Sequence, residues 1–179
     1  VADGEGQRFS ARDAVITLGP WGDEFARQLG YRPRMGVKRG YHRHFAPGAQ
    51  GLRHVIVDID HGYALAPMMR GIRLTTGAEF ALRDAPSTPT QLAQLTPIAQ
   101  QLAGLGETVD ADVWMGSRPC TADMLPIIGP APQHPGLWFN FGHAHHGLTL
   151  SAASGRLLTE MLCGQTTFTD PHPYRIERF

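Results

Sequence analysis

The chain has 179 residues, a length that corresponds to one domain or slightly more. Hydrophobic residues make up 42% of it, and 16 basic residues balance 16 acidic ones. This composition is typical of a globular protein and argues against disorder and against nucleic acid as a partner. Two cysteines give no disulfide framework, and no run is long and apolar enough to span a bilayer, so we expect a cytoplasmic protein.

The first predicted element is a short apolar strand at Ala14–Leu18. It ends in the turn Gly19–Gly22, where a glycine directly after a buried strand would permit close approach of the backbone to a ligand. A plain tight turn explains the same residues equally well. A short helix is expected over Asp23–Leu29, ended by Gly30.

Alternation predicts a long strand within Arg34–Phe45, and we interpret its basic residues as a solvated strand face. Further strands are predicted at His54–Ile59, Gly62–Met69 and Ile72–Phe80. Consecutive short strands with tight turns indicate an antiparallel sheet. The basic cluster consists of Lys38, Arg39, His42, Arg43 and His44.

A helix is predicted over Thr90–Leu105, where Pro97 would kink it or mark a restart. Its predicted apolar stripe consists of Leu92, Leu95, Ala99 and Leu102. A strand is expected at Val109–Met115. The following segment, Gly116–Pro130, is too rich in proline for regular structure to be predicted there.

The last elements are an apolar strand at Leu137–Phe141, a turn at Gly142–Gly147 and a helix that stops near Gly164. Either Thr149 or Ser151 could serve as the N-cap of this helix. A turn of this kind aims free backbone N–H groups and the positive end of the helix dipole at one point, which suits an anion or an electron-rich carbonyl.

These elements predict an α+β fold. The first and last strands are apolar on both faces, as strands covered by helices tend to be, whereas the middle resembles an antiparallel sheet with one helix layer. The chain is therefore expected to hold pieces of two domains, with the middle inserted into the first.

Four motifs, in order, resemble those of the FAD-dependent amino-acid oxidoreductases of the D-amino-acid oxidase superfamily, near its D-amino-acid dehydrogenase and glycine oxidase branch. Trp114–Gly129, WMGSRPCTADMLPIIG, is similar to the signature WxGxRPxTxDxLPxIG. Phe141–Leu150 resembles the segment GHxHxGLTL, and Val15–Trp21 resembles a strand that ends in a Gly-Pro-Trp turn. Gly62–Met68 and Ile72–Phe80 also match in order and spacing, so the resemblance runs from about Ala11 to the end.

One departure from the family pattern concerns the N-terminal half. No strand followed by GxGxxG is present, and Gly4-Glu5-Gly6 does not replace it because no strand precedes it. The resemblance therefore implies the C-terminal half of such an enzyme: the end of a Rossmann-like FAD-binding domain at 1–33, a substrate-binding sheet domain at 34–118, and a return to the FAD-binding domain at 119–179. The missing N-terminal half is then a partner, and this chain alone is expected to be inactive.

The implied reaction is dehydrogenation of the Cα–N bond of a (D-)amino acid, a small-molecule substrate, with hydride transfer to FAD. A substrate carboxylate needs a planar bidentate cation, and the motif assigns this role to Arg118. The alternative for Arg118 is an ion pair with Asp123. For the full enzyme, contact with the inner face of a membrane or with a quinone is a further expectation.

The resemblance also implies site residues on other segments. Tyr63 would hydrogen-bond the substrate, and His61 would line the same entrance. The turn after the first strand would touch FAD near its phosphates or adenine, and the last turn and helix start would face the flavin pyrimidine. The implied cofactor-binding residues are Gly19, Pro20, Trp21, Gly142, His143, Ala144, His145, His146, Gly147, Leu148 and Thr149.

Two other hypotheses remain beside the flavoenzyme. The spacing of His143, His145 and His146 occurs at metal sites, but no cysteine or carboxylate completes a set nearby, so no metal is predicted. The chain could also be a non-catalytic folded fragment or binding module without flavin. If FAD and the missing half are needed to order the site, Gly142–Gly147 should be among the less ordered parts.

Overall fold

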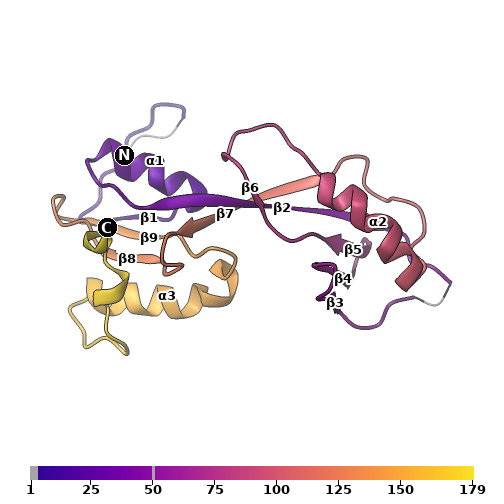
Figure 1. The fold of residues 1–179 in the computed structure, drawn as a ribbon. Helices are drawn as coiled ribbons and strands as arrows, with labels where there is room; N and C mark the ends of the chain where they lie inside the picture. The colour runs from indigo at the N-terminus through magenta and orange to yellow at the C-terminus, as the bar shows by residue number, and fades with distance from the viewer. Residues whose placement is uncertain (1–3, 50) are drawn as a thin grey trace. The chain divides into compact units, whose positions relative to one another are not determined.

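The computed structural model describes residues 4–49 and 51–179. The chain divides into two compact units, one formed by the segments up to Gly36 and from Arg118 onward, the other by Val37–Ser117 (Figure 1). Helices and strands occur in both, and the predicted α+β class is confirmed. Within the described residues, no helix is long and apolar enough to cross a membrane.

The first unit contains a three-stranded sheet in the order β1-β9-β8. Strand β1 (Ala14–Ile16) is parallel to β9 (Leu137–Phe141), and β8 (Ile127–Pro130) is antiparallel to it. Helix α1 (Gly22–Gln28) covers one face and α3 (Gly147–Leu162) the other (Figure 1).

Alternation along β9 explains this two-sided covering, because successive side chains point to opposite faces. Phe139 and Phe141 are fully buried with Ala26 of α1. Trp138 instead packs with Leu157 of α3. The unit also contains three short 3₁₀ turns, at Gly19–Trp21, His172–Tyr174 and Ile176–Arg178.

The second unit is built on an antiparallel sheet in the order β3-β4-β5-β2-β6, and β7 also pairs with β2. Tyr41, Leu65 and Leu74 of this sheet form a core with Leu92 and Ala99 of helix α2. The element bounds are Met35–Phe45 for β2, Ile56–Asp58 for β3, Tyr63–Met68 for β4, Gly71–Thr75 for β5, Glu79–Phe80 for β6, Thr90–Ala103 for α2 and Trp114–Thr121 for β7.

The strand predicted at Val109–Met115 and the irregular segment predicted at Gly116–Pro130 were both wrong, since β7 begins only at Trp114 and β8 lies within the proline-rich part. Before β7, the Asp110 carboxylate accepts hydrogen bonds from the backbone N–H and the ring of His44, which competes with regular pairing. Within β7, Pro119 lacks an N–H group, but its carbonyl still accepts a hydrogen bond from Ala144 N at 2.8 Å.

The basic residues of β2 do not form the predicted solvated face. Arg39 is only 1% exposed, and its guanidinium donates to Glu79 at 2.8 Å and to the carbonyls of Ala85 and Pro86. The loop after β6 therefore covers this side of the strand. A long aliphatic stem and a planar fork allow arginine to be buried when every N–H has a partner, which alternation alone does not reveal.

Helix α2 passes through Pro97 without a restart. It ends at Gly104, which takes the left-handed conformation expected of a C-cap glycine, with φ of +57°. Leu92 and Ala99 of its predicted apolar stripe are buried, but Leu102 is 55% exposed. The stripe is thus narrower than the sequence indicated.

Candidate functional site

The candidate site in the first unit lies at one edge of its sheet. Because β1 and β9 are parallel, with Ile16 opposite Phe139, their carboxyl ends meet at the same edge. Each strand is followed there by a glycine turn, Gly19–Gly22 after β1 and Gly142–Gly147 after β9. Open sheets of this kind bind ligands outside the carboxyl ends of parallel strands.

The two turns are joined through one close contact. Gly22 begins α1, and a Cβ atom at this position would lie only 2.6 Å from the ring of Phe141, the last residue of β9. Gly19 has a φ of +54°, a conformation that glycine adopts without strain. Trp21 between them is 56% exposed. Small residues thus hold the first turn against the end of β9.

The turn after β9 is fixed by contacts to β7. Gly142 has a φ of +81°, and a Cβ there would stand 3.2 Å from the Thr121 methyl group. His143 forms an antiparallel bridge with Cys120. Ala144 adopts a left-handed φ of +51°, unusual for a residue with a Cβ, and its N–H donates to Pro119 O.

Helix α3 begins at Gly147, so the predicted N-caps Thr149 and Ser151 were wrong. His146 occupies the N-cap, and its side chain makes no capping hydrogen bond. The Ser151 hydroxyl donates instead to Leu148 O within the first turn. The helix start therefore keeps its orphan N–H groups and positive dipole end without a side-chain cap, and Leu148 beside them is 92% exposed.

The three histidines of the turn have different surroundings. His143 is half-buried, its Nε2 lies 2.9 Å from Ser154 Oγ, and burial lowers its pKa below the usual value. His145 and His146 are exposed, with ring centroids 4.5 Å apart. Across residues 4–49 and 51–179, no group of three or more His, Cys, Asp or Glu residues could hold a metal ion.

Arg118 lies half-buried in β7, next to the two residues that contact the Gly142–Gly147 turn. Pro119 accepts from Ala144, and Cys120 is bridged to His143. The carboxylate of Asp123, considered as an alternative partner, is bound by both Nε and Nη2 of Arg178, at 2.7 and 3.2 Å.

The second unit contains the other two predicted residues, His61 and Tyr63, around one carboxylate. Asp58 Oδ2 lies 2.9 Å from His61 Nδ1, and the His61 backbone N–H donates to Asp58 Oδ1. Tyr63 is 2% exposed, and burial, with Asp58 nearby, raises the pKa of its hydroxyl. Among the described residues no group stands at full hydrogen-bonding geometry to this hydroxyl, although the Asp58 carboxylate lies close enough to interact with it.

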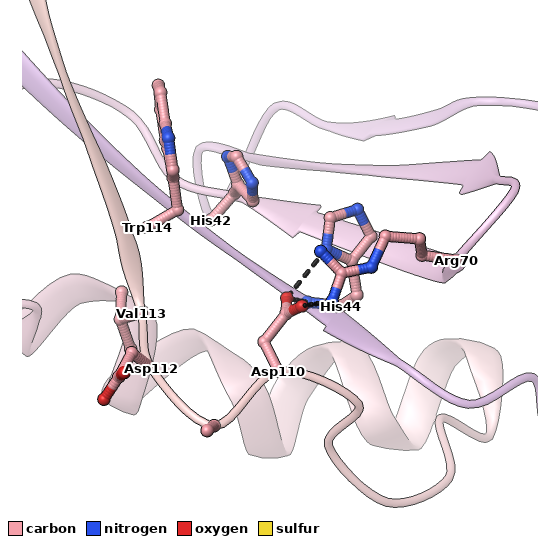
Figure 2. Close-up of a pocket in the computed structure, with 8 residues that line it drawn as sticks. His42, His44, Arg70, Asp110, Asp112, Val113 and Trp114 are labelled. Atoms are coloured by element: carbon pink, nitrogen blue, oxygen red, sulfur yellow. Dashed lines mark hydrogen bonds and ion pairs between the residues drawn. The ribbon is translucent and has the colours of Figure 1, made fainter.

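Sequence reasoning missed Asp58, which stands just before the tight turn that precedes β4. It also missed an open cavity in the second unit, shown in Figure 2. There the His42 and Trp114 rings stack with centroids 4.4 Å apart, and the Asp110 carboxylate binds both His44 and Arg70. The alternation of His42 and His44 along β2 was the signal, but it was assigned to a solvated face.

Comparison with known proteins agrees with this architecture. The family model "FAD dependent oxidoreductase" (DAO) matches residues 1–161. A glycine oxidase of Pseudomonas putida is 32% identical over 94% of this chain and 46% of its own length. A D-amino acid dehydrogenase of Cereibacter sphaeroides is 30% identical over 96% of this chain and 40% of its own.

The fold agrees as well. The crystal structure of glycine oxidase from Geobacillus kaustophilus superposes with a TM-score of 0.79 at 24% identity, over 96% of this chain and 46% of that one. The parallel strand pair with helices on both faces in the first unit and the antiparallel sheet of the second unit thus agree with the fold of that structure. The chain belongs to the DAO family of FAD-dependent oxidoreductases. It spans about half the length of the relatives that it matches.

Proposed function

We propose that this chain is the C-terminal half of a flavoenzyme that dehydrogenates the Cα–N bond of an amino acid, glycine or a D-amino acid. The relatives named glycine oxidase and D-amino acid dehydrogenase support the substrate class, and their greater length supports a missing half. That half would supply the GxGxxG segment that holds the FAD pyrophosphate. Without it, the chain binds FAD weakly and is inactive.

The observation that carries this proposal is the convergence of two glycine turns and an uncapped helix start at one sheet edge. Gly19 has open space where a Cβ would stand, and Gly142 is held in a left-handed conformation. The N-terminus of α3 has no side-chain cap, and Leu148 beside it is exposed. Such an edge fits a flat ring with electron-rich carbonyls, because backbone N–H groups can donate to them.

In this proposal the residues 142–149 face the flavin pyrimidine, and Gly19, Pro20 and Trp21 lie nearer the phosphates or adenine. FAD, if bound there, would supply the hydride acceptor for the substrate Cα–N bond, and oxygen or a quinone would take the electrons onward. The substrate would lose the Cα hydride together with one N–H proton, and water would hydrolyse the imine to a 2-oxo acid and ammonia.

Arg118 binds the substrate carboxylate in this proposal, because a guanidinium offers two parallel N–H groups to one carboxylate. Its position in β7 supports this carboxylate-binding role, since the neighbouring Pro119 and Cys120 contact the Gly142–Gly147 turn. Tyr63 and His61 keep the roles that the family resemblance implies, a hydrogen bond to the substrate and a place at its entrance. The Tyr63 hydroxyl lies beside Asp58 without a hydrogen bond of full geometry, so it can still donate to a substrate.

The test uses the natural polypeptide that contains this chain. We expect purified protein to carry FAD, seen by its absorbance, and glycine or D-alanine to bleach that absorbance without oxygen, with ammonia released. Arg118→Gln should abolish bleaching while FAD stays bound. Arg12→Gln removes an exposed arginine that pairs with Asp13 and should leave bleaching unchanged.

A colourless full-length protein would support the alternative of a non-catalytic folded module. Bound FAD that no amino acid reduces would reject the substrate class. Rapid bleaching in Arg118→Gln at wild-type substrate concentrations would reject the role of that arginine.

A further inference from the structure

One face of the sheet in the second unit is covered by α2, and the other carries a cluster of polar side chains. Tyr41, Leu65 and Leu74 face α2. His42 and His44 alternate with Tyr41 along β2 and so point the other way, and Arg73 lies directly opposite His44 across the β2–β5 pair. These side chains line an open cavity of about 830 Å³.

The charges of Asp110 and Arg70 neutralise each other at this cavity. Asp110 Oδ1 lies 2.8 Å from Arg70 Nη2. Its Oδ2 accepts from the His44 backbone N–H and lies 2.7 Å from His44 Nδ1. Both carboxylate oxygens are therefore used, and the oxygens of Asp110 hold Arg70 and His44 in place.

His44 links Asp110 to Arg73 through its two ring nitrogens. Its Nδ1 lies 2.7 Å from Asp110 Oδ2, and a carboxylate oxygen only accepts hydrogen bonds. Arg73 Nε donates to the other ring nitrogen, Nε2, at 3.2 Å. The chain Asp110–His44–Arg73 thus fixes the position of the guanidinium.

Arg73 consequently keeps its positive charge without a bonded counter-ion. In the described part of the chain no carboxylate binds it, and its hydrogen bond to His44 uses only Nε. The side chain is half-buried, so water does not fully solvate it. Asp112 lines the neighbouring cavity of about 400 Å³ and is not among the residues that line this one.

We propose that this cavity binds a carboxylate ligand, with the guanidinium end of Arg73 donating to the carboxylate and the apolar part of the ligand lying against Trp114 and Met68. Trp114 is 55% exposed and Met68 43% exposed, so both offer apolar surface beside the charge. One uncompensated guanidinium matches a monoanion, and its planar fork matches a carboxylate. The site lies wholly within Val37–Ser117 and does not rest on the proposed flavin chemistry.

The test titrates the 179-residue chain with benzoate at constant ionic strength and follows the Trp114 indole N–H by ¹⁵N NMR. We expect a saturating shift, with benzamide, the neutral analogue of the same shape, binding at least about tenfold more weakly. Arg73→Gln should weaken benzoate binding by about tenfold or more. Arg53→Gln, at an exposed position outside the cavity, should leave it unchanged.

Because Arg73→Gln could also disturb the fold, the preference for benzoate over benzamide in the unmodified chain stands as an independent measurement. Equal affinity for the two compounds, or a shift that never saturates, would overturn the proposal. So would full benzoate affinity in a folded Arg73→Gln variant. Loss of binding in Arg118→Gln but not in Arg73→Gln would place the anion at the other arginine and equally refute the cavity.

Discussion

Replacement of Gly22 by alanine should destabilise the first unit, although alanine is the better helix former. Gly22 has ordinary helical angles, φ −62° and ψ −33°, so the substitution meets no backbone strain. The added Cβ would stand 2.6 Å from one ring atom of Phe141 and 2.7 Å from another. Ordinary contact begins near 3.4 Å, so the buried ring must move by most of an ångström.

The two effects have opposite signs. Relief of glycine's conformational entropy favours alanine by roughly 0.5–1 kcal/mol, and overpacking of a tight core costs about 1–3 kcal/mol. We therefore expect Gly22→Ala to lower the free energy of unfolding by roughly 1 kcal/mol, and by no more than about 2.5 kcal/mol. Urea denaturation followed by circular dichroism would measure this as a lower midpoint at unchanged slope.

Gly155 provides the matched control, because it also lies in a helix but has no atom within 4 Å of a built Cβ. Gly155→Ala should raise stability by roughly 0.5–1 kcal/mol. In a Phe141→Leu background, the cost of Gly22→Ala should shrink, since the smaller side chain leaves room. If Gly22→Ala matched Gly155→Ala in sign and size, the close contact between the two turns would be disproved.

Two further predictions concern hydrogen-bonded polar side chains, of which Glu79 is half-buried and Ser154 is buried. Hydrogen bonds from Arg39, Thr88 and Tyr41 lower the pKa of Glu79 from its ordinary value of 4.5 to about 2. The ionised carboxylate therefore stabilises the fold fully above pH 4.5, and this stabilisation is lost as the pH falls from 4.5 toward 2. Glu79→Gln should remove that part of the acid destabilisation, which urea melts between about pH 7 and pH 3 would measure. Ser154 is 5% exposed and its hydroxyl is bonded to His143, so Ser154→Ala should cost about 1–2 kcal/mol in the same melts, whereas Ser151→Ala at an exposed position should change stability by less than about 0.5 kcal/mol. Equal pH dependence of Glu79→Gln and the unmodified chain, or equal effects of the two serine variants, would contradict these expectations.

Local patterns were enough to predict the strand–turn–helix at 137–162 and the apolar strand before Gly19. Both are short, apolar and bounded by glycine, and glycine conformations such as the +81° φ of Gly142 follow directly from the turn. The strand pairing could be expected only through the resemblance. Nothing local to Ala14–Ile16 says that it lies parallel to a strand more than a hundred residues later.

Two of the failures share one physical cause, which is that long-range partners decide the environment of a polar residue. Arg39 was assigned to solvent because its pattern is that of an exposed strand, yet Glu79 and the carbonyls of Ala85 and Pro86 bury it. Asp110 lies at the start of the predicted strand Val109–Met115, but it binds His44, 66 residues away, and the strand begins only at Trp114. A period-2 pattern reports which residues share a face, not what covers that face.

The two ends of the Gly142–Gly147 turn should behave differently in the absence of flavin. Its first part is held by the protein, since Ala144 N–H donates to Pro119 O and His143 is bridged to Cys120. Its last part leads into α3, whose first N–H groups have no intrahelical acceptor and no side-chain cap. Without a ligand we therefore expect the first part of the turn to be ordered and its last part, at the start of α3, to be mobile.

Hydrogen exchange on the 179-residue chain tests this division. The amide of Ala144 should be protected, whereas those of Leu148 and Thr149 should exchange close to the rate of an unstructured peptide. Leu150, whose N–H donates to His146 O at 2.8 Å, marks where helix protection begins and serves as the internal reference. Rapid exchange at Ala144 would mean that the left-handed conformation there requires the cofactor, and protection at Leu148 would mean that the helix start is not available to receive one.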